Sequence, residues 1–369
     1  MKIYSHEYFL KKILDCSMEE LNATIESKKS VCSEFKIPKQ DGERTIVQVE
    51  SNCSLERLQK KLLSSFLSMV PISVAAKGFV KGSSYVDFLE EHVGHEFFLR
   101  LDIKDFFGSI SNQLLEDSLA PFLEEESKKD VIELCTIDSK VPQGFLVSPV
   151  ISNIVFRRID QRIRKYCRYY NKEMDRTIFY TRYADDMLFS SNGFDFKENK
   201  NFKGMILHIL EENGFTCNER KTIYARNEIS LSGYVISKDV HLSRKKLHNI
   251  HEIIYLFDAR TKYDDTPFQL KKKRDLERLI RILNEKHLKK SNGEVIEFKG
   301  IENLIHYIAG WRSYLIQISR ADHSKTDYGK QMGKKIMKLE KILDYLSGIE
   351  EKNGEKSKEK DEIEWQTQE

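Results

Sequence analysis

The sequence predicts a mixed α+β fold, in which an antiparallel sheet carries acidic side chains and amphipathic helices pack around it. Two apolar runs of strand composition, 97–107 and 178–189, are each interrupted by aspartates. Apolar residues at helical spacing mark other stretches, including 53–68 and 202–212. The 369 residues are enough for two or three subdomains around a sizeable core.

The second apolar run contains two adjacent carboxylates, Asp185 and Asp186. The residues on either side, 178–180 and 187–189, have strand composition, which predicts a hairpin with negative charge at its tip. Carboxylates this close repel each other and require a nearby cation. A surface turn is the alternative interpretation, because Asp is common in turns.

The first apolar run supplies a third carboxylate in a similar setting. In a strand, Asp102 and Lys104 share one face, while Leu101 and Ile103 share the other. A carboxylate inside an apolar strand is costly unless it is paired or binds a metal. Neighbouring strands that present Asp102 and Asp185 offer the oxygen ligands for a pair of Mg²⁺ ions in a phosphoryl displacement.

Three motifs resemble those of reverse transcriptases and follow one another in that family's order. Tyr183–Asp186 resembles the catalytic box, and Leu101–Phe107 resembles the first metal-binding motif. Between them, Val141–Asn153 resembles the Pro-Gln-Gly motif that precedes a helix of the palm. The resemblance extends over 35–318 and implies a right-hand polymerase with fingers, a palm of antiparallel sheet plus helices and a helical thumb, but no RNase H domain.

Within that family, the sequence resembles bacterial retron enzymes. Lys77–Ser84, followed by Glu91–Gly94, is similar to their segment before the first Asp motif. Two departures stand beside this likeness: Phe88-Leu89 replaces the usual Asn-Ala, and Leu231-Ser232-Gly233 replaces the usual Val-Thr-Gly. A related defence-type bacterial reverse transcriptase therefore stays open as an alternative.

The resemblance divides the chain into consecutive segments. These are an N-terminal helical extension (1–30), fingers (31–100), a palm (101–240) with an interleaved fingers segment (about 111–145), a thumb (241–348) and a disordered tail (349–369). Disorder is expected in the tail because it is rich in Lys and Glu and almost without apolar residues.

The resemblance also implies which residues form the active site. The expected catalytic residues are Asp102, Asp185 and Asp186. Together with the Ile103 carbonyl they are the expected ligands of two Mg²⁺ ions, for which Mn²⁺ could substitute. Phe107 occupies the position at which the family excludes a 2′-hydroxyl by contact. The expected nucleotide-binding residues are Lys39, Arg44, Asp105, Phe106, Phe107, Gln143 and Lys221.

Positive charge is concentrated in one part of the sequence. The whole chain has 61 basic and 58 acidic residues, a net charge of +3. Residues 241–300 alone hold fifteen Lys and Arg against nine Asp and Glu, which predicts a local basic surface. Solvated helix faces are the alternative interpretation. The expected nucleic-acid-binding residues are Arg244, Lys245, Lys246, Lys271, Lys272, Lys273, Arg274, Trp311 and Arg312.

The six cysteines contain no Cys-x-x-Cys pair, which argues against a zinc site and against a secreted disulfide framework. The sequence also shows no signal-peptide segment and no apolar run of about 18 residues. We therefore expect a cytoplasmic protein without a membrane role.

The resemblance implies RNA-directed DNA synthesis. For a retron enzyme, the expected partners are dNTPs, a cognate structured noncoding RNA, the RNA–DNA hybrid product and an effector protein encoded nearby, with a role in antiphage defence. The alternatives are another defence or abortive-infection reverse transcriptase, and a catalytically silent RNA-binding scaffold on the same fold.

Overall fold

The computed structural model describes residues 2–39, 42–174, 177–263, 273–289, 294–321 and 327–366. The chain forms two compact units, Met1–Ile229 and Ser230–Glu369. The first unit contains both acidic runs, and the second contains the basic C-terminal segment.

A five-stranded antiparallel sheet lies at the centre of the first unit. Its strands are β3 (Phe97–Lys104), β4 (Ile178–Tyr183), β5 (Asp186–Ser191), β6 (Thr216–Cys217) and β7 (Ile223–Arg226). Strand β5 lies between β4 and β3, while β6 and β7 pair with different parts of β3. Most side chains of β3 and β5 are buried, and both predicted apolar strands are confirmed.

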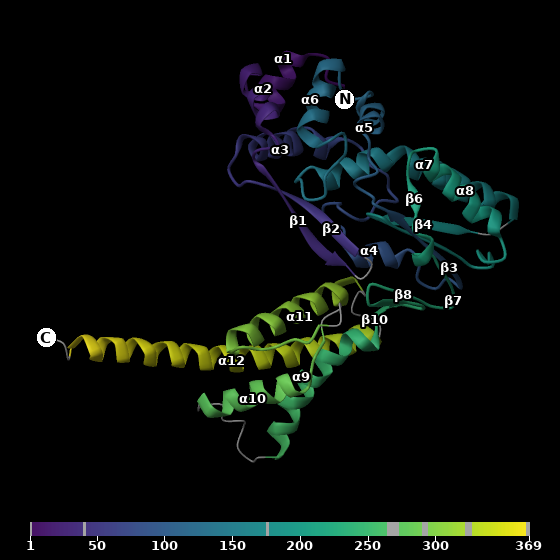
Figure 1. Cartoon of the computed structure of the whole chain (residues 1–369). Helices are drawn as coiled ribbons and strands as arrows, with labels where there is room; N and C mark the ends of the chain where they lie inside the picture. The colour runs from purple at the N-terminus through teal and green to yellow at the C-terminus, as the bar shows by residue number, and fades with distance from the viewer. Residues whose placement is uncertain are drawn as a thin grey trace. The chain divides into compact units, whose positions relative to one another are not determined.

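Two helices, α7 (Ser148–Met174) and α8 (Lys200–Glu211), cover one face of this sheet (Figure 1). Aromatic rings join them to it. Phe202 of α8 stacks on Tyr166 of α7 with ring centroids 5.5 Å apart, and meets Phe189 of β5 edge-on at 5.5 Å. Burying rings of this size contributes about 2–3 kcal/mol each, so the helices and the sheet share one core.

Short helices make up most of the rest of the first unit. They are α1 (His6–Tyr8), the π-helix η1 (Phe9–Leu14), α2 (Met18–Ser27), α3 (Ser54–Ser65), η2 (Leu67–Met69), α4 (Tyr85–Glu90), α5 (Asn112–Leu119), α6 (Glu125–Cys135) and η3 (Glu219–Lys221). Serine hydroxyls cap several of them by accepting free backbone N–H groups. The Ser17 Oγ, for example, accepts a hydrogen bond from Glu20 N at 3.2 Å before α2.

A separate antiparallel hairpin consists of β1 (Cys32–Lys39) and β2 (Gly42–Val49). Its register pairs Phe35 with Ile46. Residues 40 and 41, at the tip, lie outside the described residues.

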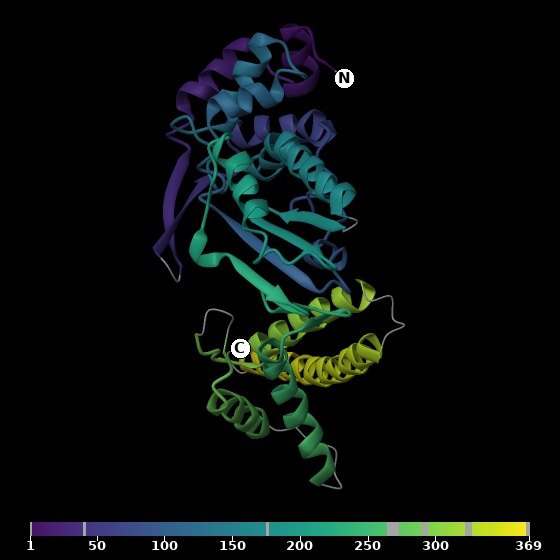
Figure 2. The ribbon, with the colours of Figure 1, turned by 90° about the vertical axis from the view of Figure 1, so that its right-hand side faces the viewer.

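From Ile229 onward, the residues that the structure describes form a small three-stranded sheet and four helices. The sheet contains β8 (Ile229–Leu231), β9 (Tyr234–Ile236) and β10 (Val240–Leu242), and the helices are α9 (Arg244–Tyr263), α10 (Lys273–Glu285), α11 (Ile301–Ala321) and α12 (Asp327–Gln366). Helices α11 and α12 lie side by side in both views of the ribbon (Figures 1 and 2). The Arg312 guanidinium joins them by donating to Glu340 Oε1 at 2.6 and 2.8 Å.

The disordered tail over 349–369 stays a prediction, and in the structure α12 continues through this segment to Gln366. Lys and Glu are strong helix formers, and opposite charges four residues apart stabilise a helix further. A segment with few apolar residues can therefore extend a helix that packs elsewhere. Residues 367–369 lie outside the described residues.

The mixed α+β class with antiparallel sheets is confirmed. The division into fingers, palm and thumb stays a prediction, and the boundary between the two compact units falls at 229/230, inside the segment predicted as palm. In the part of the chain that the structure describes, no helix is both long and apolar enough to span a membrane.

Candidate active site

The register of the central sheet brings the three predicted aspartates together. Asp102 of β3 lies directly opposite Asp186 of β5. Asp185 lies next to them, because Ile103 N donates to the Asp185 carbonyl oxygen at 3.0 Å. The turn Tyr183–Asp186, here called the acidic turn, reverses the chain through Ala184, whose φ is 54°.

Two basic side chains contact these carboxylates. The Arg100 Nε donates to Asp186 Oδ1 at 2.9 Å, and its Nη2 contacts the same oxygen and lies 3.5 Å from Asp102 Oδ1. The Lys221 Nζ donates to Asp102 Oδ1 at 3.1 Å. Asp102 is only 3% exposed, and these partners compensate the cost of burying a carboxylate.

Burial raises the pKa of both Asp185 and Asp186 above the ordinary value of 3.8. For Asp186, the guanidinium of Arg100 lowers the pKa and partly offsets this rise. For Asp185, the neighbouring charge of Asp102 raises the pKa further, while the charge of Arg44 lowers it. The acidic turn therefore holds negative charge that is only partly compensated.

The donor set fits a hard divalent cation. Carboxylate oxygens from Asp102 and Asp185 are the ligands that Mg²⁺ and Mn²⁺ prefer. Burial raises the pKa of Asp185, and a cation beside it would favour its ionised form. Among the described residues, no group of three or more His, Cys, Asp or Glu is arranged to hold a metal ion. Arg100 engages Asp186, and Lys221 engages one oxygen of Asp102, so an ion held by Asp102 and Asp185 would have to share Asp102 with Lys221 or displace it.

The fully buried Arg182 supports the acidic turn from behind. Its Nη1 donates to the Ala184 carbonyl at 3.1 Å, and its Nη2 pairs with Asp160 Oδ2 at 2.9 Å. The same Nη2 donates to Asn153 Oδ1 at 3.1 Å, and Asn153 Nδ2 donates to the Gly78 carbonyl at 2.9 Å. One hydrogen-bond network thus joins α7, the acidic turn and the segment around residue 78.

Gly78 packs directly against the acidic turn. A Cβ at this position would lie 2.7 Å from Ala184 N and 3.1 Å from the Tyr183 carbonyl carbon. Only glycine allows so close an approach of two backbones.

The two phenylalanines after Asp102 have different surroundings. Phe106 is buried, with ring centroids 5.0 Å from Phe156 and 6.3 Å from Phe215, so it belongs to the core. Phe107 is half-buried, and its ring lies 6.0 Å from that of Phe79. Asp105 is exposed, with a φ of 45°.

The Pro-Gln-Gly loop packs on the β1–β2 hairpin. The Gln143 carbonyl accepts a hydrogen bond from Val47 N at 2.8 Å. Gly144 follows with a φ of 122°, and a Cβ there would collide with the Val47 carbonyl oxygen. Arg44 is exposed on β2, and Lys39 ends β1 with its side chain outside the described residues.

The predicted nucleic-acid-binding residues are not equivalent. Arg244 and Lys245 are exposed at the start of α9. The Lys246 ammonium instead lies over the rings of Tyr234 and Tyr314, 4.7 and 4.4 Å from their centroids.

Other residues of this set take part in packing or lie outside the described residues. Trp311 packs edge-on against Tyr307 and Tyr314, and Arg312 pairs with Glu340. Lys271 and Lys272, and the side chains of Lys273 and Arg274, lie outside the described residues.

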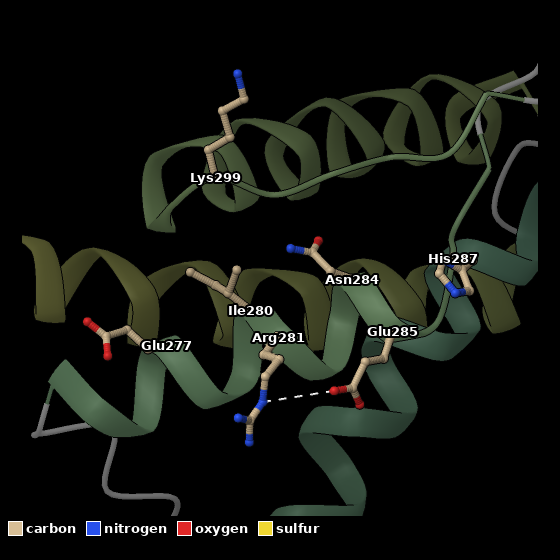
Figure 3. Close-up of a pocket in the computed structure, with 7 residues that line it drawn as sticks. All are labelled: Glu277, Ile280, Arg281, Asn284, Glu285, His287 and Lys299. Atoms are coloured by element: carbon tan, nitrogen blue, oxygen red, sulfur yellow. Dashed lines mark ion pairs between the residues drawn. The ribbon is translucent and has the colours of Figure 1, made fainter.

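An open pocket of about 540 Å³ lies on α10 in the second unit (Figure 3). Its lining includes Arg281 and Glu285, which form an ion pair of 3.9 Å, and Lys299. None of the predicted site residues lines this pocket.

Sequence reasoning missed three residues that shape the site. Arg100 precedes Asp102 by two positions and so shares its face of β3, a spacing that could have revealed it. Arg182 is a charge inside an apolar strand, the same signal that singled out Asp102. Phe79 owes its position to a left-handed backbone, with a φ of 60°, that no local pattern predicts.

Comparison with known proteins identifies the class. Residues 37–236, more than half of the chain, match the family model of reverse transcriptase (RNA-dependent DNA polymerase). The chain therefore belongs to the reverse transcriptase family.

Within this family the chain is similar to retron reverse transcriptases, as its motifs predict. It is 29% identical over 242 residues to the Mx65 retron reverse transcriptase of Myxococcus xanthus, a match that covers 60% of this chain and 55% of that protein. It is 28% identical over 216 residues to the Ec86 retron reverse transcriptase of Escherichia coli, covering 58% and 64%. The chain thus spans between about half and two thirds of the length of these curated relatives.

Among solved structures, the telomerase of Candida albicans in complex with a fragment of telomeric RNA aligns with a TM-score of 0.43 and 12% identity. That alignment covers 86% of this chain and 66% of the telomerase.

Proposed function

We propose that this chain is an RNA-directed DNA polymerase that adds deoxynucleotides to a primer by nucleotidyl transfer. One observation carries the proposal: the β3–β5 register sets Asp102 opposite Asp186, with Asp185 beside them at the acidic turn. Membership of the reverse transcriptase family supports the same reaction.

In this reaction a primer hydroxyl attacks the α-phosphate of a dNTP, and pyrophosphate leaves. A bound divalent cation would lower the pKa of the hydroxyl and neutralise charge on the leaving group. Asp102 and Asp185 would hold it, with the Ile103 carbonyl and Asp186 as the further predicted ligands. Arg100 donates to Asp186 and fixes this carboxylate beside the other two.

Other residues of the site would bind the nucleotide. The positive charge of Arg44 lowers the pKa of Asp185, as expected for a group that lies near the site and contacts a triphosphate. The Lys221 ammonium donates to Asp102, and it would exchange this hydrogen bond for one to a phosphate oxygen of the bound nucleotide. The half-buried ring of Phe107 would exclude a 2′-hydroxyl by contact.

The finer proposal is a retron activity. In it, the polymerase binds a cognate structured noncoding RNA, starts synthesis from a 2′-hydroxyl within that RNA, and makes RNA-linked single-stranded DNA for antiphage defence together with an effector. Similarity to the retron reverse transcriptases supports this proposal.

Primer extension on an RNA template with Mg²⁺ tests the polymerase. We expect Asp185→Asn and Asp102→Asn to lower dNTP incorporation by at least about a thousandfold while RNA binding persists, because only charge at the reacting phosphate is lost. Asp117→Asn, an exposed aspartate on α5, is the matched control and should extend normally. Near-normal extension by either active-site variant would mean that the assignment is wrong.

The retron proposal has its own test. The chain is expressed with its flanking locus, and nucleic acid is extracted and sequenced. RNA-linked single-stranded DNA is the expected product, whereas untemplated or protein-linked DNA would favour another defence reverse transcriptase. A wild type that binds RNA but never extends a primer would favour a silent scaffold.

A further inference from the structure

The backbone at Phe79 is strained, although the ring of this residue is exposed. The φ of Phe79 is 60°, a left-handed conformation that bulky L-residues rarely adopt. Its side chain is 40% exposed. The packing of a fully buried ring would offset the cost of this strain, but an exposed ring gains little from packing. We therefore take the position of the ring as the reason for the strained backbone.

Hydrogen bonds on the N-terminal side hold this segment in place. Arg182 N donates to the Ala75 carbonyl at 2.7 Å, and Lys77 N donates to the Arg182 carbonyl at 2.8 Å. The Gly78 carbonyl accepts from Asn153 Nδ2 at 2.9 Å. Phe79 is therefore fixed to the strand that leads into the acidic turn.

The ring of Phe79 lies between two residues of the site. Its centroid is 6.0 Å from that of Phe107 and 6.5 Å from that of Tyr183, with interplanar angles of 44° and 39°. Phe107 and Tyr183 are each half-buried. Phe79 therefore lies beside both the Phe107 ring and the ring of Tyr183, which precedes Asp185 by two positions.

We propose that Phe79 is a specificity-determining residue: it holds the Phe107 ring against the sugar of the incoming nucleotide, so that rejection of ribonucleotides depends on both rings. This rests on the proposed polymerase function. Without Phe79, the Phe107 ring has open space on that side and can move away from a 2′-hydroxyl.

The test measures kcat/KM for a dNTP and for the matching rNTP on a primed RNA template, together with the melting temperature. The variants are Phe79→Ala, Phe79→Gly and Phe79→Tyr, with Phe107→Ala alone and combined with Phe79→Ala. Tyr169→Ala, an exposed ring on α7, controls for loss of an aromatic side chain. Ser139→Gly, at a φ of 62°, controls for relief of a left-handed backbone.

We expect Phe79→Ala and Phe79→Gly to lower the dNTP-to-rNTP ratio by about tenfold, while Phe79→Tyr keeps it. The double variant Phe79→Ala/Phe107→Ala should have the same dNTP-to-rNTP ratio as Phe107→Ala alone, because both substitutions remove the same contact with the sugar. Phe79→Gly should fold at least as well as the wild type, since glycine adopts positive φ without strain, so lost discrimination cannot be attributed to unfolding.

An unchanged ratio in a folded Phe79→Gly variant would overturn this inference while leaving the polymerase intact. Additive losses in the double variant would also overturn it, since the two rings would then act separately. A wild type that fails to extend the primer would overturn the proposed function, and this inference with it.

Discussion

Arg100 makes the two adjacent acids of the acidic turn unequal. It donates to Asp186, whereas Asp185 has no comparable guanidinium partner among the contacts described above. A buried carboxylate is stable as an anion only when it is paired. The pairing therefore favours the ionised form of Asp186 and leaves the charge of Asp185 for a substrate or an ion.

We predict that Arg100→Gln shifts the acidic limb of the pH–rate profile to higher pH by about one unit or more. The sign follows from the charges: Arg100 lowers the pKa of Asp186, so removing it raises that pKa, and more alkaline conditions are needed to ionise the site. Measuring kcat/KM between pH 5 and 8 checks this. Arg226→Gln, which removes an exposed arginine paired with Glu96 on the same sheet, should leave the profile unchanged.

His92 makes folding sensitive to acid. It is fully buried, its Nδ1 lies 2.6 Å from Ser190 Oγ, and its Nε2 lies 2.7 Å from Thr181 Oγ1. Burial, with smaller effects from His95 and Lys77, lowers the pKa of His92 from 6.5 to about 3. Both hydroxyls belong to the strands that flank the acidic turn.

We therefore predict that the free energy of unfolding falls as the pH drops below 6.5, because His92 binds a proton in the unfolded chain but not in the folded one. The loss contributed by His92 reaches about 2 kcal/mol at pH 5. His92→Gln should melt at a lower temperature than the wild type at pH 7, because hydrogen bonds are lost, but its melting temperature should fall less between pH 7 and 5. Equal falls in the two proteins would contradict the assignment.

At the scale of elements, one ion pair joins α7 to the acidic turn. Arg182 and Asp160 are both fully buried and lie 2.9 Å apart, and the hydroxyl of Tyr180 also donates to Asp160 at 2.7 Å. Such a pair is costly to break but can often be replaced by apolar residues without loss of stability. Its stabilising and positioning roles can therefore be separated.

We predict that Asp160→Leu lowers the free energy of unfolding by about 3–5 kcal/mol, because a charged arginine stays buried without its partner. The double variant Asp160→Leu/Arg182→Met should recover most of this loss. Its primer extension should nevertheless stay at least about tenfold below the wild type, because the Ala184 carbonyl has lost its donor. Thermal unfolding and primer extension are measured on the same samples, and full recovery of both would mean that Arg182 is only a packing residue.

The strands of the site could be predicted from the sequence because apolar runs broken by Asp are rare and costly. Their pairing could be expected only from the resemblance. The sequence could not separate Phe106 from Phe107, since the left-handed turn at Asp105 decides which ring enters the core. Nor could a basic run reveal that the Lys246 ammonium contacts two aromatic rings, because that contact joins residues distant in the sequence.

At the scale of the whole molecule, positive charge in the second unit divides into exposed and engaged groups. Arg244 and Lys245 are exposed, whereas Lys246 is half-buried and burial lowers its pKa. Only exposed cations can release counterions from a nucleic acid backbone when they bind it. The formal charge of the segment therefore overstates its capacity for such contacts.

We predict that Arg244→Gln/Lys245→Gln weakens binding to an RNA–DNA duplex and makes the dependence of log Kd on log salt shallower by about 1.5 in slope. Lys246→Gln is the internal comparison: it should lower the melting temperature and leave the slope unchanged, because its ammonium serves the aromatic contact. Fluorescence anisotropy over a series of salt concentrations measures both. An unchanged slope in the double variant would assign duplex binding to other residues.

The pairing of Asp102 with Asp186 depends on alignment along β3, which is held on one side by β5 and on the other by β6 and β7. Deleting a single residue from 97–101 would turn every following side chain of that strand to the opposite face. A scan of one-residue insertions and deletions should therefore find this short stretch intolerant, even at positions where many substitutions are accepted. Among natural variants, the lengths of these strands should differ far less than their amino-acid sequences.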